Sequence, residues 1–317
     1  MLVTITNTGR MAQTVTPTAA IPLYGRSADN IRDHRHVTSL LHRIETTDTG
    51  VLVTPTLSFD ERGHQVNHMT YYCVGWSGNG EKPVDFYPTA EDFVGEGGNF
   101  ERPYAIVKNA EGVKAGTKIE GLEAVGGLHF SEITLEPEEE CSYLIFTGIT
   151  EDIQEIRNLS KTYTTREKVL EELEKTKAYW QEKVNVAYHT GDSDFNQFMH
   201  WVSFQPILRR IYGCSFLPHH DYGKGGRGWR DLWQDCLALL IMNPDGVRQM
   251  LLDNFAGVRI DGSNATIIGS KQGEFVADRN NITRVWMDHG VWPMITTKFY
   301  IDPDRRSELL EKEAALF

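Results

Sequence analysis

The chain has 317 residues, 40% of them hydrophobic, and is long enough for two domains with sizeable cores. Its formal net charge of −12 argues against a nucleic-acid partner, because proteins that bind phosphate backbones carry clustered Lys and Arg. No apolar run approaches the roughly 20 residues that span a bilayer, so we expect no membrane partner.

The four cysteines, Cys73, Cys141, Cys214 and Cys236, are scattered without metal-ligand spacing. Because the N-terminus also lacks a signal-peptide pattern, we expect reduced thiols in a cytoplasmic protein with no metal site. The glycine-rich loop Gly223–Gly228 fits neither the P-loop nor the dinucleotide-binding pattern, which argues against a nucleotide cofactor.

Residues 1–150 are predicted to form a β-sandwich. Short runs of β-branched and aromatic residues are separated by turn residues, and these runs are Leu2–Thr6, Gly50–Phe59, Met69–Val74 and Ser142–Phe146. The pattern is typical of an antiparallel sandwich rather than of βαβ units. Because the first run begins without any lead-in, we expect the sandwich to be incomplete at its N-terminus.

Residues 151–190 are predicted to form a helical linker. Thr164 and Glu167 have the spacing of a capping box, and apolar residues follow at helical intervals as far as Val184. Glu and Lys residues fill the opposite face, which we expect to be the solvated side of an amphipathic helix.

Residues 191–317 read as all-helical and suggest an α/α toroid. One segment runs from Phe195 to Ile211 and is expected to be interrupted at Pro206. Further helices are predicted at Asp231–Met242, Asp245–Phe255, Gly290–Ile301 and Arg305–Leu316. So few helices do not close a toroid, and we therefore expect only its first part.

The helix predicted near Arg230 is apolar nearly all round but has an ionic cluster at its N-terminal tip. At about 3.6 residues per turn, Asp231, Gln234 and Asp235 lie on one flank with Arg230 adjacent. Arg and Asp together provide the donors and acceptors that vicinal sugar hydroxyls require. In the structural alternative, Asp231 only stabilises the helix N-terminus and Arg230 pairs with Asp235.

A second candidate site is the segment Arg284–Pro293, where Trp286 and Trp292 flank Asp288 and His289. Indole rings stack on the apolar C–H faces of a pyranose, while an acid and an imidazole bind its hydroxyls. The alternative is a tryptophan-rich core with one hydrogen bond between Asp288 and His289, and this segment alone favours that alternative.

Three segments occur in an order that resembles the phosphorylases of glycoside hydrolase family 94. They are HWVSFQPILRRIYGCSF, GGRGWRDLWQDCLALLIMNPD and RVWMDHGVWPM, and the second contains the family's R-D-x-x-Q-D pattern. The resemblance implies a β-sandwich followed by a helical linker and the first part of an (α/α)6 toroid. The segment GWRDLWQD and the FD-x-x-x-H-x-V pattern at Phe59–Val66 look closest to the β-1,2-oligoglucan phosphorylase branch.

The resemblance also implies inverting phosphorolysis of β-glucan oligosaccharides to a sugar 1-phosphate. Inorganic phosphate, a co-substrate rather than a cofactor, attacks the anomeric carbon while a carboxylic acid protonates the leaving oxygen. The implied substrate-binding residues are Arg230, Asp231, Gln234, Asp235, Trp286, Asp288, His289 and Trp292. The family's general acid lies in a D-W-N/D-D-like stretch that does not occur between Trp292 and Phe317. We therefore expect it beyond Phe317 and this chain alone to be inactive.

Two alternatives stay open. One is a non-catalytic, truncated carbohydrate-binding remnant, or one half of a split enzyme. The other is an inverting hydrolase that uses Asp288 as its acid. The expected partners are an oligosaccharide substrate and either a second copy in a homodimer or a complementing downstream chain.

Overall fold

The structure is a computed structural model that describes residues 1–25, 38–60, 63–212, 227–268, 275–276 and 288–301. The helix predicted at Arg305–Leu316 lies outside the described residues. The chain divides into two compact units, Met1–Lys175 and Thr176–Phe317, which are described separately.

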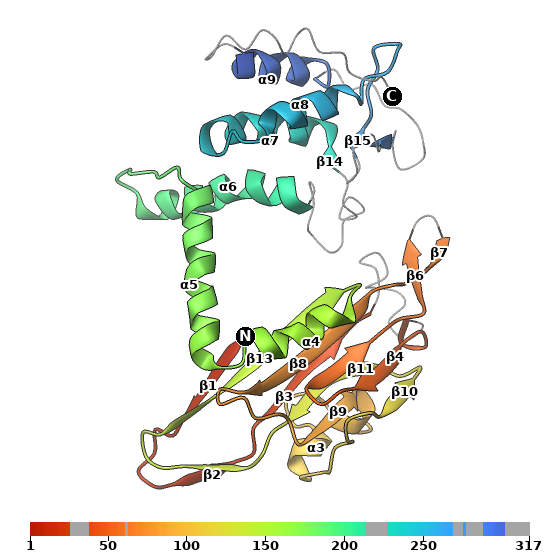
Figure 1. Ribbon diagram of the computed structural model, residues 1–317, viewed down its shortest axis with the longest axis vertical. Coiled ribbons are helices and arrows are strands. Elements are labelled where there is room, and N and C mark those ends of the chain that lie inside the picture. Colours follow the sequence, from red (N-terminus) through yellow and green to blue (C-terminus); the bar gives the residue numbers. More distant parts are fainter. Residues whose placement is uncertain (26–37, 61–62, 213–226, 269–274, 277–287, 302–317) are drawn as a thin grey trace. The chain divides into compact units, whose positions relative to one another are not determined.

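The first unit is a sandwich of antiparallel sheets (Figure 1). The six-stranded sheet has the order β1 (Leu2–Thr6), β13 (Glu140–Thr150), β8 (Thr70–Ser77), β5 (Gly50–Val53), β4 (Arg43–Thr46) and β10 (Lys118–Glu120). The three-stranded sheet has the order β3 (Thr18–Leu23), β11 (Ala124–His129) and β9 (Asp85–Thr89). Two further pairs join β12 (Ile133–Leu135) to β2 (Gln13–Val15), and β6 (Leu57–Asp60) to β7 (Gly63–Val66). The predicted antiparallel sandwich is confirmed.

Both faces of the six-stranded sheet are covered by apolar cores, because successive side chains along its strands point to alternate faces. Val51 and Val53 on β5 face one core together with Leu128 of the three-stranded sheet. Leu52, between them, belongs to a second core on the opposite face, where Ile156 of α4 (Ile153–Thr162) packs. Successive side chains on a strand point to opposite faces, so an uninterrupted apolar strand serves two cores. Figure 1 shows α4 lying across this sheet.

Short helices complete the first unit. α2 (Ala90–Val94) and α3 (Tyr104–Val107) pack beside β9. The longer α5 (Arg166–Lys183) crosses the boundary between the two units. The side chain of Glu167 hydrogen-bonds Thr165 rather than Thr164. The predicted cap is therefore one residue too early, because α5 begins only at Arg166.

The second unit contains four described helices, α6 (Ser193–Tyr212), α7 (Trp229–Met242), α8 (Val247–Phe255) and α9 (Val291–Ile301). A small antiparallel sheet joins β14 (Arg227–Gly228), β15 (Ile267–Ile268) and β16 (Phe275–Val276). The all-helical prediction is therefore wrong in detail. The chain is extended where it enters α7, and the Trp229 amide donates to the carbonyl of Thr266 at 2.9 Å.

The core of the second unit is built around α7. Trp229, Trp233 and Leu239 are each at most 1% exposed, and they pack with Ile207 of α6 and Leu251 of α8. The prediction that α7 buries its body is confirmed. A second difference concerns α6, which continues through Pro206 instead of being interrupted there.

Candidate functional site

A pocket of about 450 Å³ lies in the second unit beside α6 and α7, and its lining on α7 runs from Asp231 in the first turn to Met242 at the end of the helix. Its polar lining from α7 consists of Asp231, Gln234 and Asp235. Three of the four residues of the predicted cluster at the tip of α7 therefore face one hollow. The helical spacing predicts this, because positions three and four apart share a face.

The fourth residue of the cluster, Arg230, does not line this pocket, and Asp235 is paired with a different arginine. Arg209 of α6 donates from Nε to Asp235 Oδ2 at 2.7 Å and from Nη2 to Asp235 Oδ1 at 2.6 Å. The structural alternative, in which Arg230 pairs with Asp235, is therefore wrong. Five positions along a helix place two side chains about 140° apart, on different faces.

The Arg209–Asp235 pair is largely withdrawn from water. The Asp235 side chain is 8% exposed and that of Arg209 is 29% exposed. A carboxylate so enclosed is tolerated only when it is paired, and the two parallel N–H···O bonds provide that pairing. The pair therefore presents a fixed arrangement of donors and acceptors at the pocket wall.

The rest of the pocket combines an aromatic ring, a buried hydroxyl and apolar side chains. Tyr188 and Ser203 line it, and so do Val202, Pro206 and Ile241. Pro206 has no backbone N–H, so the carbonyl of Val202 lacks its usual helical donor. The pocket is thus lined by both polar and apolar side chains, and each of the two helices contributes both kinds.

The second predicted segment meets the tip of α7 through Asp288. Arg230 Nε lies 2.5 Å from Asp288 Oδ2, and its Nη2 donates to Asp288 Oδ1 at 3.1 Å. The indole Nε1 of Trp292 donates to Asp288 Oδ2 at 3.1 Å. The hydrogen bond from Arg230 is the main cause that lowers the pKa of Asp288 below its usual value, and the bond from Trp292 adds to it.

His289 is buried beside this ion pair. Its carbonyl oxygen accepts a hydrogen bond from Trp229 Nε1 at 3.0 Å, and its ring Nδ1 lies 3.1 Å from Asn264 Nδ2. Burial is the main cause that lowers the pKa of His289, and Arg230 adds to this effect. The structural alternative paired Asp288 with His289, but these hydrogen bonds join each of the two to other residues.

The structure therefore sorts the predicted site residues into two groups. Asp231, Gln234 and Asp235 line the pocket, whereas Arg230, Asp288, His289 and Trp292 form the junction between α7 and α9. Trp286 lies outside the described residues. Sequence reasoning missed Arg209 and Tyr188. The only signal for Arg209 was that a buried Asp on α7 requires a cation from a neighbouring segment.

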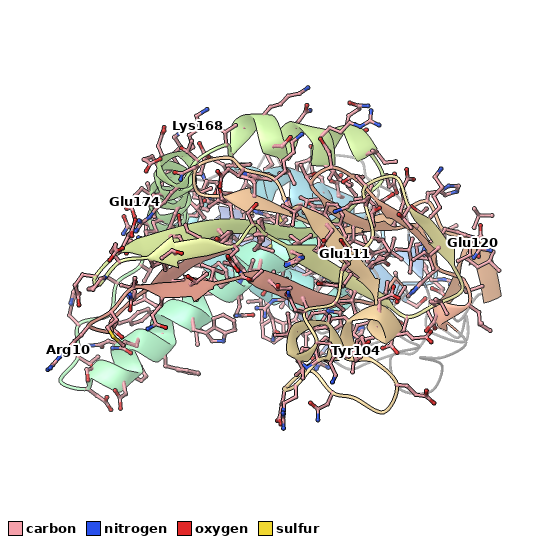
Figure 2. All side chains as sticks on the ribbon, turned by 90° about the horizontal axis from the view of Figure 1, so that it is seen from below. Arg10, Tyr104, Glu111, Glu120, Lys168 and Glu174 are labelled. Atoms are coloured by element: carbon pink, nitrogen blue, oxygen red, sulfur yellow. The ribbon has the colours of Figure 1, made fainter. Side chains whose placement is uncertain are left out.

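A hollow of about 360 Å³ in the sandwich unit has a different character. Glu91, Asp92, Glu96 and Glu111 line it, together with Tyr104, and no Lys or Arg is among its lining residues. Tyr104 and Glu111, both labelled in Figure 2, come from α3 and from the loop after it. This surface contains none of the residues singled out in the sequence, so the pocket beside α7 is the better candidate.

Within the described parts of the chain, other classes of site find no support. No three His, Cys, Asp or Glu side chains there are grouped closely enough to hold a metal ion. No helix among the described residues has the length and apolarity needed to cross a bilayer. Cys73, Cys141 and Cys236 carry free thiols, and Cys214 lies outside the described residues.

Comparison with known proteins adds two findings. The family description "Glycosyl hydrolase 94, supersandwich domain" matches residues 1–166, which is just over half of the chain. The chain is also 25% identical over 225 residues to the cyclic beta-(1,2)-glucan synthase NdvB of Rhizobium meliloti (strain 1021). That alignment covers 69% of this chain and 8% of the synthase.

Proposed function

The chain belongs to glycosyl hydrolase family 94, and from this premise we propose that its second unit binds a β-glucan oligosaccharide in a phosphorylase-type enzyme. The pocket beside α7 carries the proposal. It brings Asp231, Gln234 and Asp235, all from one R-D-x-x-Q-D stretch, into the lining of a hollow large enough for a sugar ring. Within this proposal, helices α6 to α9 form the first part of the (α/α)6 toroid.

The chemistry of the pocket supports a neutral sugar as ligand. Carboxylate and amide groups form hydrogen bonds with hydroxyls, while the apolar side chains of the lining suit the C–H face of a pyranose. Arg209 is the only cation among the lining residues, and its charge is matched by that of Asp235. Inorganic phosphate, the proposed co-substrate, would therefore bind elsewhere. No organic cofactor or metal is part of the proposal.

A β-1,2-linked glucan is the proposed substrate. The support is the similarity of the segment GWRDLWQD to the β-1,2-oligoglucan branch, together with the similarity of the chain to a cyclic beta-(1,2)-glucan synthase. The proposed reaction is inverting phosphorolysis to a sugar 1-phosphate, with a general acid outside the described residues. We also propose a cytoplasmic location, for which free thiols are the support.

The hydrolase alternative, with Asp288 as the acid, is less well supported. A general acid must be protonated at the working pH, and Arg230 lowers the pKa of Asp288. Two partners in fixed geometry keep this carboxylate ionised. Asp288 is better suited to orienting neighbouring groups than to donating a proton.

Titration calorimetry with trisaccharides of β-1,2-, β-1,3- and β-1,4-linked glucose tests the proposal. We expect the β-1,2 trisaccharide to bind most tightly and Asp235→Asn to weaken that binding. A parallel assay with inorganic phosphate measures sugar 1-phosphate, and free glucose formed without phosphate would favour the hydrolase. Absence of binding to all three trisaccharides would overturn the proposed function.

A further inference from the structure

Arg209 is a charged residue of the pocket that lies outside the R-D-x-x-Q-D motif. It lies on α6, 26 residues before Asp235, and its guanidinium meets both carboxylate oxygens at 2.6 and 2.7 Å. A guanidinium is a planar fork, so two parallel bonds fix the plane of the carboxylate as well as its distance. A lysine ammonium makes point contacts and does not impose such a plane.

The backbone that carries Arg209 is itself held in place. The preceding residues Pro206 and Ile207 are buried, and Ile207 belongs to the core around α7. The next residue, Arg210, donates from Nη1 to the carbonyls of Asn243 at 3.5 Å and Asp245 at 3.2 Å, in the turn after α7. The two adjacent arginines thus have different tasks. Arg210 anchors α6 to that turn, and Arg209 reaches the pocket.

We propose that Arg209 is a positioning residue, whose guanidinium orients the Asp235 carboxylate so that sugar hydroxyls meet its oxygens in one arrangement. This inference rests on the proposed sugar-binding function. It adds that the binding carboxylate depends on a cation from a different helix. Without that cation, we expect the Asp235 carboxylate to lose the plane that the two parallel bonds impose on it.

The pair of adjacent arginines provides a matched test by titration calorimetry with the β-1,2-linked glucose trisaccharide. Arg209→Lys keeps the charge but removes the fork, and we expect its Kd to rise by about tenfold, the effect of losing one charge-assisted hydrogen bond. Arg209→Met should bind more weakly still, and added guanidinium ion should restore part of its affinity. The control Arg210→Met removes the adjacent cation, which anchors α6 but does not line the pocket, and should weaken binding much less than Arg209→Met does.

A double-mutant cycle with Asp235→Asn separates positioning from direct contact. If Arg209 acts through Asp235, Arg209→Met should weaken binding little in the Asp235→Asn background. Fully additive losses would overturn the inference, as would wild-type affinity in Arg209→Lys. If Arg209→Met does not fold, the test uses three other variants. These are Asp235→Asn, Arg209→Lys and the double variant Arg209→Met/Asp235→Asn, which lacks both charges.

A crystal structure of sugar-free Arg209→Lys tests the orientation itself. We expect the Asp235 carboxylate to adopt a different rotamer or several rotamers, whereas an unchanged rotamer would overturn the inference. Failure of the proposed function has another signature. In that case the wild type binds none of the three trisaccharides, although the Asp235 rotamer still depends on Arg209.

Discussion

The Arg230 guanidinium and the Asp288 carboxylate join the start of α7 to the turn that precedes α9, with Nε and Oδ2 2.5 Å apart. Trp292, the second residue of α9, donates to the same carboxylate oxygen. Two residues 58 positions apart in the sequence therefore fix where these helices begin relative to each other. Their side chains are 43% and 40% exposed, so the pair orients the junction more than it stabilises the fold.

The ion pair predicts a pH dependence of stability. The pKa of Asp288 is lowered in the folded state, so its contribution is complete above the ordinary value of about 3.9 and is lost as the pH falls through the folded pKa. Urea unfolding of wild type and Asp288→Asn should thus differ by a constant amount above about pH 5 and converge in acid. In an Arg230→Gln background the difference above about pH 5 should be smaller, and an unchanged difference would show that Arg230 does not lower this pKa.

His289 predicts a second pH dependence, at higher pH. Burial lowers its pKa below 6.5, so as the pH falls the unfolded chain takes up a proton before the folded chain does. Arg230 acts in the same direction, while Asp288 and Asp231 oppose it. The wild type should therefore lose stability as the pH falls from about 7.5 through the unfolded pKa of about 6.5 and on to the lower folded pKa.

His289→Gln removes that proton uptake and should flatten this part of the stability profile. Urea unfolding at several pH values measures the stability profile. As a control, His200→Gln removes an exposed imidazole from α6 and should leave the profile unchanged. A wild-type profile that stays level from pH 7.5 to 5.5 would show that burial does not hold His289 neutral.

Local sequence patterns predicted helices and strands well where the residues of one segment alone determine its secondary structure. The strand Leu2–Thr6 is found at the predicted bounds. The predicted strand Gly50–Phe59 is split, because β5 ends at Val53 and β6 begins at Leu57 on the other side of Pro55, which has no backbone N–H for a ladder. Apolar spacing also showed which helix of the second unit is buried.

Partners of charged groups could not be predicted in the same way. Asp231, Gln234 and Asp235 share a helix flank, and so their common exposure to one pocket follows from the helical repeat. The cation for Asp235 comes from a helix 26 residues earlier, and Arg230 meets an acid much later in the chain. Such pairings depend on how helices pack, which no spacing within one segment shows.

The sandwich predicts a backbone position that tolerates no side chain. A Cβ on Gly50 would lie 2.1 Å from the carbonyl oxygen of Cys73 and 2.6 Å from the Cα of Val74, both on the paired strand. Gly50→Ala should therefore lower the free energy of unfolding by about 2 kcal/mol or more, because the β5–β8 pairing must shift. The control Gly191→Ala has open space around its Cβ and should change stability by less than about 0.5 kcal/mol.

Helix α7 offers a matched pair of core and surface positions. Leu239 is completely buried in the core of the second unit, whereas Ile241, two residues later, is 77% exposed. Leu239→Ala should lower the free energy of unfolding by about 2–5 kcal/mol through lost burial and the cavity that remains. Ile241→Ala should change it by no more than about 0.5 kcal/mol. Equal effects of the two changes, measured by urea unfolding, would contradict the assignment of Leu239 to the buried face of α7.

Stability also distinguishes the Arg209–Asp235 pair from an ordinary surface ion pair. Removing Arg209 takes the guanidinium from an Asp235 side chain that is only 8% exposed, and a buried carboxylate that loses its paired cation is strongly destabilising. Arg209→Met should thus lower the free energy of unfolding by about 3 kcal/mol. Arg209→Met combined with Asp235→Leu removes both charges and should be less destabilised than Arg209→Met, because no charge is left unpaired. If the double variant is less stable than both single variants, the pair contributes through its net attraction rather than through the penalty of an unpaired charge.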